Sequence, residues 1–445
     1  MLKFGTDGVR GVANLDLTPE LVLALGRAAA RVLEGWQFVV GRDTRLSGPL
    51  LESALIAGLT AEGAQVTSLG VVPTPAVAWL AAADHAAGAV ISASHNRFED
   101  NGVKLFASGG RKLSDDVESA LEAELHAVLA HQGTGAARTG DAVGTVVDGA
   151  GEVGRWADSI VRSIDGRALE GMTLVIDCAN GAASEWAPKV LRALGARVEV
   201  LHDEPDGTNI NAGCGSTYPE DLQRAVVGRG ADAGLAFDGD ADRVLAVDAD
   251  GRLIDGDQII AVLAIDRHGE GRLAQDTVVA TVMANLGFRR GMREHGIRVL
   301  EVPVGDRYVL EALADGSLVL GGEQSGHVIF SDLATTGDGI LTAVQLLDAV
   351  QRAGRPLGEM ADAAMTRLPQ VLRNVRVAEK GLELGQAVTD EVAKVEAELG
   401  DDGRVLVRGS GTEPLVRVMV EAATAEAAER AAERLVAVVE ANGAD

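Results

Sequence analysis

A chain of 445 residues is too long for one hydrophobic core, so three or four domains are expected. Apolar residues make up 47% of the chain and aromatic residues only 3%, which favours cores of small aliphatic side chains, as in layered α/β proteins. The formal charge of −26 argues against nucleic acid and anionic membranes as partners, because both bind basic surfaces.

The two cysteines, Cys178 and Cys214, are too few and too far apart for a disulfide framework or a zinc site. The first residues lack the apolar run of a signal peptide, and no uncharged apolar stretch approaches the ~18 residues that span a bilayer. We therefore expect a soluble protein of the reducing cytoplasm.

The first part of the chain opens with a glycine-punctuated loop, residues 4–11, that carries Arg10. Thr18 followed by Pro19 and Glu20 predicts the start of a helix that runs to about residue 33. A further helix is expected at residues 115–129. Residues 131–154 are rich in Gly, Ala and Thr, which indicates a domain boundary.

Three stretches of the chain share one pattern of strand, turn, helix and Gly-x-x-Val, at residues 38–66, 173–198 and 277–299. Each has the size of a βαβ element, so the pattern predicts three related α/β domains with mixed sheets. Residues 371–442 read instead as short strands and two helices, typical of a smaller C-terminal α+β domain. The expected domains are residues 1–150, 151–253, 254–367 and 368–445.

A candidate nucleophile follows a short apolar strand at residues 88–91, where the chain changes abruptly to small polar residues. Ser94 lies in this loop, with His95 beside it and Lys104 ten residues further on. Parallel-sheet proteins usually carry their chemistry at such strand ends. Taken alone, such a loop is more often an ordinary serine-rich turn.

The strongest metal signal is Asp238, Asp240 and Asp242, three carboxylates at alternate positions directly after an apolar strand. On an extended segment they project to one side, and hard oxygen ligands of this kind suit Mg²⁺. The alternative is a solvated acidic turn. An EF-hand is excluded, because Arg243 stands where Gly is required and Ala249 where Glu is required.

Two further loops offer groups for a phosphorylated sugar. Residues 408–414 expose backbone N–H groups, hydroxyls and an arginine, with Arg417 beyond, which favours a phosphate cradle. Glu323 and Ser325 lie in the tight loop 321–327 and suit sugar hydroxyls, and Arg307 is a further basic candidate. Each loop, judged alone, could equally be a plain turn. Taken together, the four loops indicate phosphoryl transfer on a sugar phosphate.

The sequence resembles the α-D-phosphohexomutase superfamily over essentially its whole length. The resemblance rests on residues 4–11, 41–48, 92–96, 238–243, 322–327 and 410–414. Gln324 resembles the glucosamine branch, whereas the phosphomannomutase/phosphoglucomutase branch usually has Met there. Two positions depart from the family pattern: Arg97 replaces the usual Pro, and Gly409 stands where the family varies. Because Pro fixes φ near about −65°, Arg97 is expected to loosen the loop or to add a charge near the substrate.

This resemblance implies interconversion of glucosamine 6-phosphate and glucosamine 1-phosphate through a phosphoserine at Ser94 and glucosamine 1,6-bisphosphate, which feeds UDP-N-acetylglucosamine and cell-wall synthesis. It implies one Mg²⁺ held by the three aspartates and a phosphoserine oxygen. The implied catalytic residues are Ser94, His95, Lys104 as a general base and Arg10 as a clamp. The implied substrate-binding residues are Arg307, Glu323, Ser325, Arg408, Ser410, Gly411, Thr412 and Arg417.

Three other classes remain as alternatives. The first is the phosphomannomutase/phosphoglucomutase branch. The second is a metal-dependent sugar phosphatase, although Ala241 stands where haloacid-dehalogenase-type enzymes usually have Thr or Val. The third is a non-catalytic sugar-phosphate-binding protein, which would need neither Ser94 nor the aspartates. A homodimer is compatible with the sequence.

Overall fold

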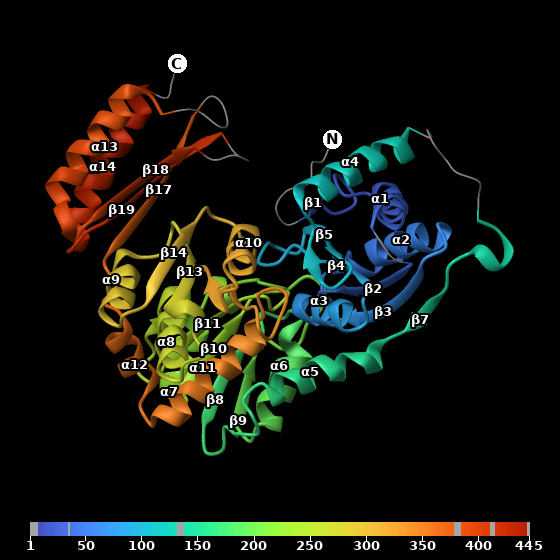
Figure 1. The fold of residues 1–445 in the computed structure, drawn as a ribbon, viewed down its shortest axis with the longest axis horizontal. Coiled ribbons are helices and arrows are strands. Elements are labelled where there is room, and N and C mark those ends of the chain that lie inside the picture. Colours follow the sequence, from blue (N-terminus) through green and yellow to red (C-terminus); the bar gives the residue numbers. More distant parts are fainter. Residues whose placement is uncertain (1–7, 34–35, 131–137, 378–383, 410–413, 443–445) are drawn as a thin grey trace. The chain divides into compact units, whose positions relative to one another are not determined.

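The computed structural model describes residues 8–33, 36–130, 138–377, 384–409 and 414–442. The chain forms two compact units (Figure 1). The first unit comprises residues 1–283 and 297–362, and the second comprises residues 284–296 and 363–445.

The first unit holds three sheets, and the N-terminal one follows the order β1-β5-β4-β2-β3-β7, with β6 paired to β5. Its central strand β4 is buried along its whole length, as expected for an apolar strand between paired neighbours. The strands are β1 (Val9–Val12), β2 (Gln37–Arg42), β3 (Gln65–Val71), β4 (Ala87–Ile91), β5 (Asp100–Ala107), β6 (Arg111–Lys112) and β7 (Val146–Asp148).

The other two sheets of this unit follow the orders β12-β11-β10-β8-β9 and β14-β13-β15-β16. The strands of the former are β8 (Thr173–Asp177), β9 (Arg197–Leu201), β10 (Ala233–Phe237), β11 (Val244–Asp248) and β12 (Leu253–Ile254). The strands of the latter are β13 (Thr277–Thr281), β14 (Arg298–Val302), β15 (Leu320–Gly322) and β16 (Val328–Phe330).

All three sheets contain the same four-strand arrangement: β3-β2-β4-β5, β9-β8-β10-β11 and β14-β13-β15-β16. In each, the first three strands are parallel and the fourth runs antiparallel to the third. The first two strands of each set are the parallel pair expected from the repeated sequence pattern. The prediction of three related α/β domains with mixed sheets is therefore confirmed.

Helices cover these sheets, and the first helix begins where its sequence signal predicts. Thr18 caps the first helix by accepting a hydrogen bond from the Leu21 N–H at 3.3 Å. The helices of the first unit are α1 (Pro19–Val32), α2 (Gly48–Ala61), α3 (Thr74–Ala83), α4 (Asp115–Leu129), α5 (Val153–Arg162), α6 (Ala183–Ala193), α7 (Glu220–Arg229), α8 (Gly256–Gly269), α10 (Asp306–Gly316) and α11 (Gly339–Ala353). α9 (Leu286–Glu294) belongs to the second unit, and α12 (Leu357–Ala364) begins in the first unit and ends in the second. No described helix is both long and apolar enough to cross a lipid bilayer.

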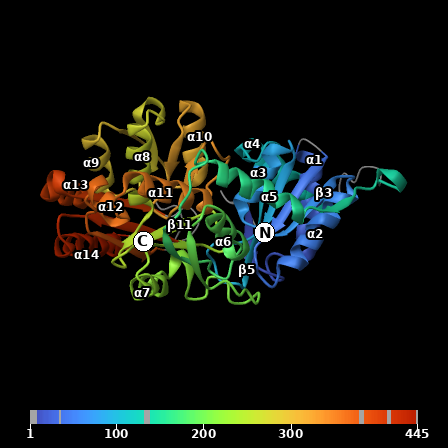
Figure 2. The ribbon, with the colours of Figure 1, turned by 90° about the horizontal axis from the view of Figure 1, so that it is seen from below.

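The second unit contains the antiparallel sheet β17-β19-β18. Its elements are β17 (Gln370–Arg376), β18 (Arg404–Gly409), β19 (Leu415–Glu421), α13 (Gln386–Leu399) and α14 (Ala425–Asn442). The two helices lie side by side against the sheet (Figures 1 and 2). Val416, Val418 and Val420 alternate along β19 and join the core that these helices cover. The expected small α+β domain is confirmed.

Candidate active site

The three site loops of the first unit occupy one equivalent position in the three repeated sheets. Each is the connection between the third strand of the repeat and its antiparallel fourth strand. Ser94 lies between β4 and β5, the aspartates lie between β10 and β11, and Glu323 lies between β15 and β16. Because the repeats share one topology, the same strand edge of each domain supplies one part of the site.

Ser94 and the aspartate loop meet directly. The Ser94 Oγ donates a hydrogen bond to Asp238 Oδ2 at 2.6 Å, and both side chains are buried. The Ser94 backbone has a φ of 51°, in the left-handed region that a residue with a Cβ seldom adopts. Gly239 lacks a side chain where the two loops touch, because a Cβ there would lie 2.6 Å from the Ser94 carbonyl oxygen.

The carboxylates of Asp238, Asp240 and Asp242 converge, with one oxygen of each lying within 4.8 Å of the others. All three residues are buried. Oδ1 of Asp240 and Oδ1 of Asp242 have no hydrogen-bond partner among the described residues, although Arg243 Nε lies 3.7 Å from Asp242 Oδ1. Buried carboxylate oxygens without donors are unfavourable unless a cation binds them, so this donor set fits a hard divalent cation such as Mg²⁺.

Lys104, on β5, bridges two of these aspartates. Its Nζ lies 2.7 Å from Asp240 Oδ2 and 3.3 Å from Asp242 Oδ2. The Thr74 hydroxyl donates a second hydrogen bond to Asp240 Oδ2 at 2.6 Å. The lysine therefore lies within the cluster, and its service as a general base stays a prediction.

Burial and neighbouring charge set the titration of the cluster. Burial, followed by the charges of Asp242 and Asp240, raises the pKa of Asp238 well above its ordinary value. Burial would also raise the pKa of Asp242, but Lys104 and then His327 hold it well below the ordinary value. The three carboxylates therefore have different environments. Lys104 contacts Asp240 and Asp242, and His327 contacts Asp242, whereas neither contacts Asp238 in the described contacts.

His95 lies beside Ser94, with Nδ1 3.4 Å from Ser94 Oγ and 3.4 Å from an Arg243 nitrogen. Burial, followed by the charges of Arg243 and Arg10, lowers the pKa of His95 to about 4. The imidazole is therefore neutral near pH 7 and can accept a hydrogen bond there. Arg10, on β1, belongs to the same electrostatic environment.

The third loop holds Glu323 and Ser325 as the sequence predicted, with Ser325 Oγ 3.4 Å from Glu323 Oε2. Glu323 Oε1 accepts a hydrogen bond from the Gly305 N–H at 3.1 Å. His327 links this loop to the aspartate loop, because its Nδ1 lies 3.8 Å from Asp242 Oδ2 and its Nε2 lies 3.7 Å from Asp306 Oδ2. Burial alone would lower the pKa of His327, but Asp242 and then Asp306 raise it.

Arg307 follows Gly305 and Asp306, the two residues that contact Glu323 and His327. Its guanidinium forms ion pairs with Asp115 and Glu118 at the start of α4. Its role in substrate binding stays a prediction.

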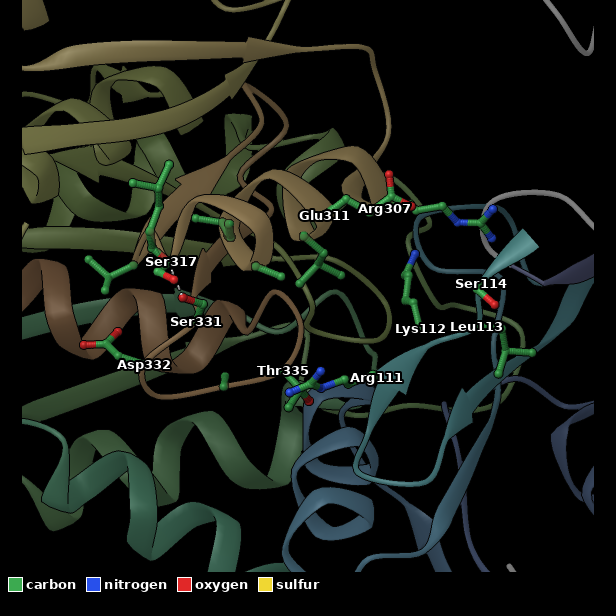
Figure 3. Close-up of a pocket in the computed structure, with 16 residues that line it drawn as sticks. Arg111, Lys112, Leu113, Ser114, Arg307, Glu311, Ser317, Ser331, Asp332 and Thr335 are labelled. Carbon is green, nitrogen blue, oxygen red and sulfur yellow. Dashed lines mark hydrogen bonds between the residues drawn. The ribbon is translucent and has the colours of Figure 1, made fainter. Parts of the chain in front are cut away.

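A cavity of about 510 Å³ lies beside Arg307, between the start of α4 and the α10 region (Figure 3). Arg111, Lys112 and Ser114 line it on one side, and Ser317 and Ser331 line it on the other. Its lining includes neither Ser94 nor any of the three aspartates. The cavity is therefore distinct from the candidate catalytic centre.

The predicted phosphate cradle belongs to the second unit. Arg408 on β18 and Arg417 on β19 are direct cross-strand partners. Both alternate with the valines that join the core, so they project from the opposite face of the sheet. Burial, followed by the charge of Arg417, lowers the pKa of Arg408. Ser410, Gly411 and Thr412 lie outside the described residues.

Two contributors to the site escaped sequence reasoning. Thr74, at the first position of α3, contacts Asp240, and Asn211 of the second sheet's domain contacts the Ser94 loop. Both lie more than 100 positions from their partners. Thr74 stands in an apolar stretch that gave no signal, and Asn211 stands in a stretch of small polar residues that resembles an ordinary turn.

Comparison with known proteins agrees with this geometry. Four domain models of the phosphoglucomutase/phosphomannomutase family match the chain: α/β/α domains I, II and III at residues 1–131, 155–251 and 255–368, and the C-terminal domain at residues 372–438. The chain therefore belongs to the phosphoglucomutase/phosphomannomutase family. The four domain ranges expected from the sequence stay predictions.

The curated relatives point to one branch of the family. A phosphoglucosamine mutase of Frankia casuarinae is 54% identical, with 98% of this chain and 97% of the relative covered. A phosphoglucosamine mutase of Rhodococcus opacus is 52% identical, with 98% of each chain covered.

Solved structures share the fold. A phosphoglucomutase/phosphomannomutase family protein from Burkholderia thailandensis superposes with a TM-score of 0.80 at 27% identity, covering 99% of this chain and 98% of that one. The N-acetylphosphoglucosamine mutase of Aspergillus fumigatus gives a TM-score of 0.70 at 20% identity, covering 100% and 96%.

Proposed function

We propose that the protein is a phosphoglucosamine mutase that interconverts glucosamine 6-phosphate and glucosamine 1-phosphate. The observation that carries the proposal is the 2.6 Å contact between Ser94 Oγ and Asp238, which joins a nucleophile loop to a carboxylate cluster from another domain. The choice of glucosamine over glucose or mannose draws on the 54% identical relative of that name.

In the proposed reaction Ser94 carries the phosphoryl group. The bond between Ser94 Oγ and phosphorus breaks as O1 of glucosamine 6-phosphate attacks and loses its proton to a base, while the departing Ser94 Oγ gains a proton, giving glucosamine 1,6-bisphosphate. After this intermediate reorients, Ser94 Oγ accepts the phosphoryl group from O6 and gives up its own proton. O6 gains a proton and glucosamine 1-phosphate leaves. Phosphoryl transfer of this kind depends mainly on positioning and on charge stabilisation.

Asp238, Asp240 and Asp242 would hold a Mg²⁺ ion, which when bound would neutralise charge on the transferring phosphoryl group. The buried Oδ1 atoms of Asp240 and Asp242 accept no hydrogen bond among the described residues and are suited to bind such a cation. Lys104 adds a fixed positive charge at the same place. Neutral His95 beside Ser94 Oγ is placed to accept a proton from a hydroxyl in reach.

The remaining roles follow the chemistry of each loop. Glu323 and Ser325 would bind sugar hydroxyls. Arg408 and Arg417 would bind the phosphate that is not reacting, because two guanidinium groups opposite each other on neighbouring strands can both donate charge-assisted hydrogen bonds to its oxygens. Such a cradle can bind either phosphate of the bisphosphate, as the reorientation requires. Ser410, Gly411 and Thr412 are proposed to complete it.

The test is an assay of the full chain with Mg²⁺ and a catalytic amount of a hexose 1,6-bisphosphate. Glucosamine 1-phosphate, glucose 1-phosphate and mannose 1-phosphate are compared as substrates, and glucosamine 1-phosphate should react fastest. Intact-mass analysis should show a fraction heavier by one phosphate that is absent in Ser94→Ala. Near-normal turnover by Ser94→Ala would refute the nucleophile. Comparable rates on glucose 1-phosphate would indicate the neighbouring branch, and release of inorganic phosphate would indicate a phosphatase.

A further inference from the structure

A buried arginine lies behind the Ser94 loop. Arg45 is 1% exposed and pairs with the wholly buried Asp43, whose Oδ2 lies 2.9 Å from its Nε. The two terminal nitrogens of Arg45 donate to four backbone carbonyls of the loop: Ser94 at 2.8 Å, Asn96 at 2.9 Å, Asp100 at 3.1 Å, and Arg97. One planar guanidinium thus binds almost the whole turn that carries the nucleophile.

Asp43, the partner of Arg45, also holds the N-terminal side of the Ser94 loop through Ser92. The Ser92 hydroxyl donates to Asp43 Oδ2 at 2.6 Å and accepts a hydrogen bond from the Ser94 N–H at 2.9 Å. Ser94 is therefore held through its N–H by way of Asp43 and through its carbonyl by Arg45. These bonds fix the peptide groups on both sides of the Ser94 Cα, where the backbone is in the left-handed region.

A residue of the neighbouring domain reinforces this arrangement. Asn211 Nδ2 donates to the carbonyl of Ser94 at 2.9 Å and to that of Asn96 at 3.0 Å, so it shares both acceptors with Arg45. Asn211 is itself buried and adopts a φ of 56°, which Asn tolerates better than most residues. The domain that provides the aspartates therefore also fixes the position of the loop that faces them.

We propose that Arg45 and Asn211 are positioning residues that hold the Ser94 loop in its left-handed turn, so that Ser94 Oγ stays aligned with the carboxylate cluster. The inference rests on the proposed function, in which Ser94 Oγ must donate a phosphoryl group and later accept one at the same place. A displacement of ~1 Å in such a group can lower the rate on the order of 100-fold. Neither residue needs to contact the substrate for this effect.

The experiment compares Arg45→Lys with Arg267→Lys in the full chain. Both arginines are buried and paired with an aspartate, but Arg267 pairs with Asp332 and packs over the Phe330 ring at 5.3 Å, among residues outside the proposed site. Lysine keeps the charge and loses the planar fork that reaches several carbonyls. Arg45→Lys should lower kcat by about 10- to 100-fold and change KM by less than about 3-fold. Arg267→Lys should leave kcat within about 3-fold.

A second variant keeps the test decisive if Arg45→Lys does not fold. Asn211→Asp preserves size and tolerance of positive φ but removes the amide donor. Asn285→Asp is its control, because Asn285 is a buried asparagine that donates to the Leu368 carbonyl at 3.0 Å within the second unit. Asn211→Asp should lower kcat with KM little changed, whereas Asn285→Asp should alter thermal stability more than kcat.

A separate readout distinguishes failure of this inference from failure of the proposed function. Transfer of a phosphoryl group from glucose 1,6-bisphosphate to Ser94 is followed by intact mass in wild type and variants, independently of which hexose phosphate is turned over. Slower phosphorylation of Ser94 in both site variants supports positioning. A kcat and a phosphorylation rate within about 2-fold of wild type in Arg45→Lys and Asn211→Asp would overturn it. Loss in the two control variants to the same extent would also overturn it.

Discussion

Ser94 Oγ donates to Asp238 Oδ2 at 2.6 Å, although the two residues are 144 positions apart in sequence. Asp238→Asn should keep this contact in outline but remove the charge that a divalent cation requires. We expect turnover to fall on the order of 100-fold or more. Calorimetric titration with Mg²⁺ should show weakened binding. Asp248→Asn is the control, since Asp248 is a buried carboxylate of the same domain that pairs with Arg252 instead; normal Mg²⁺ binding by Asp238→Asn would contradict the assignment.

Lys104 supplies positive charge to Asp240 and Asp242. In Lys104→Met these buried carboxylates lose a cationic partner, which typically costs about 3–5 kcal/mol. Because Mg²⁺ would partly replace the lost charge, the fall in Tm should be larger in EDTA than in Mg²⁺. Lys112→Met, which removes an ion pair with Asp306, should show no such dependence on Mg²⁺. An equal fall in both buffers would count against a cation at the cluster.

His202 should make stability depend on pH. Its hydrogen bond with Asp177, followed by the charges of Asp177, Asp221 and Asp203, outweighs burial and raises the pKa of His202. The protonated form therefore stabilises the fold fully below the unfolded value of about 6.5, and this contribution is lost as the pH rises through the folded pKa. Wild type should lose Tm over that window, and His202→Gln should lose less.

The control for this pH series is His85→Gln, which replaces an exposed histidine. Its Tm should follow the wild-type curve. Identical curves for His202→Gln and wild type would show that the Asp177 contact has no part in the pH dependence.

Arg97 is 84% exposed along its side chain and pairs with Glu99 at 3.2 Å. Exposed ion pairs contribute about 0–1 kcal/mol, so Arg97→Ala should change Tm little. The loop contact of this residue runs through its carbonyl, which accepts from Arg45 and is kept in the variant. We expect kcat within about 3-fold of wild type. A large fall in kcat measured with glucosamine 1-phosphate would instead assign the Arg97 side chain a role at the substrate.

Arg408 lies opposite Arg417 on the neighbouring strand. Removing the Arg408 guanidinium should therefore weaken substrate binding without lowering stability. Arg408→Gln should raise KM for the sugar phosphate by about 10- to 100-fold, because a charge-assisted hydrogen bond to phosphate is lost. Relief of repulsion should leave Tm unchanged or higher. Arg404→Gln, which breaks a pair with Glu421 at 3.1 Å, should lower Tm. An unchanged KM in Arg408→Gln would remove this residue from the cradle.

The sequence was sufficient for those features that a local pattern specifies. Thr18-Pro19 marked the start of α1, the repeated pattern predicted the parallel pairs, and the spacing of Asp238, Asp240 and Asp242 predicted a cluster that the structure shows. These features depend on backbone periodicity and strand ends, which neighbouring residues determine.

Contacts between distant segments could not be predicted in this way. Arg45 reads as one more charge in an arginine-rich loop, yet it is almost fully buried behind Ser94. The ion pairs of Arg307 with Asp115 and Glu118, about 190 positions away, left no mark in the sequence either, and its role at the substrate stays a prediction. Ion pairs between distant segments form only when the domains fold and pack, so no local sequence pattern predicts them.

The two hydrogen bonds that the Ser94 carbonyl accepts, from Arg45 and Asn211, affect the order in which the active site forms during folding. One donor to that carbonyl, Arg45, comes from the N-terminal domain, and the other, Asn211, comes from the next domain along the chain. A ribosome-bound fragment that ends before residue 211 would therefore have the nucleophile but only half of its support. Because domains commonly fold one after another, recovery of activity during refolding should lag behind recovery of helical circular dichroism.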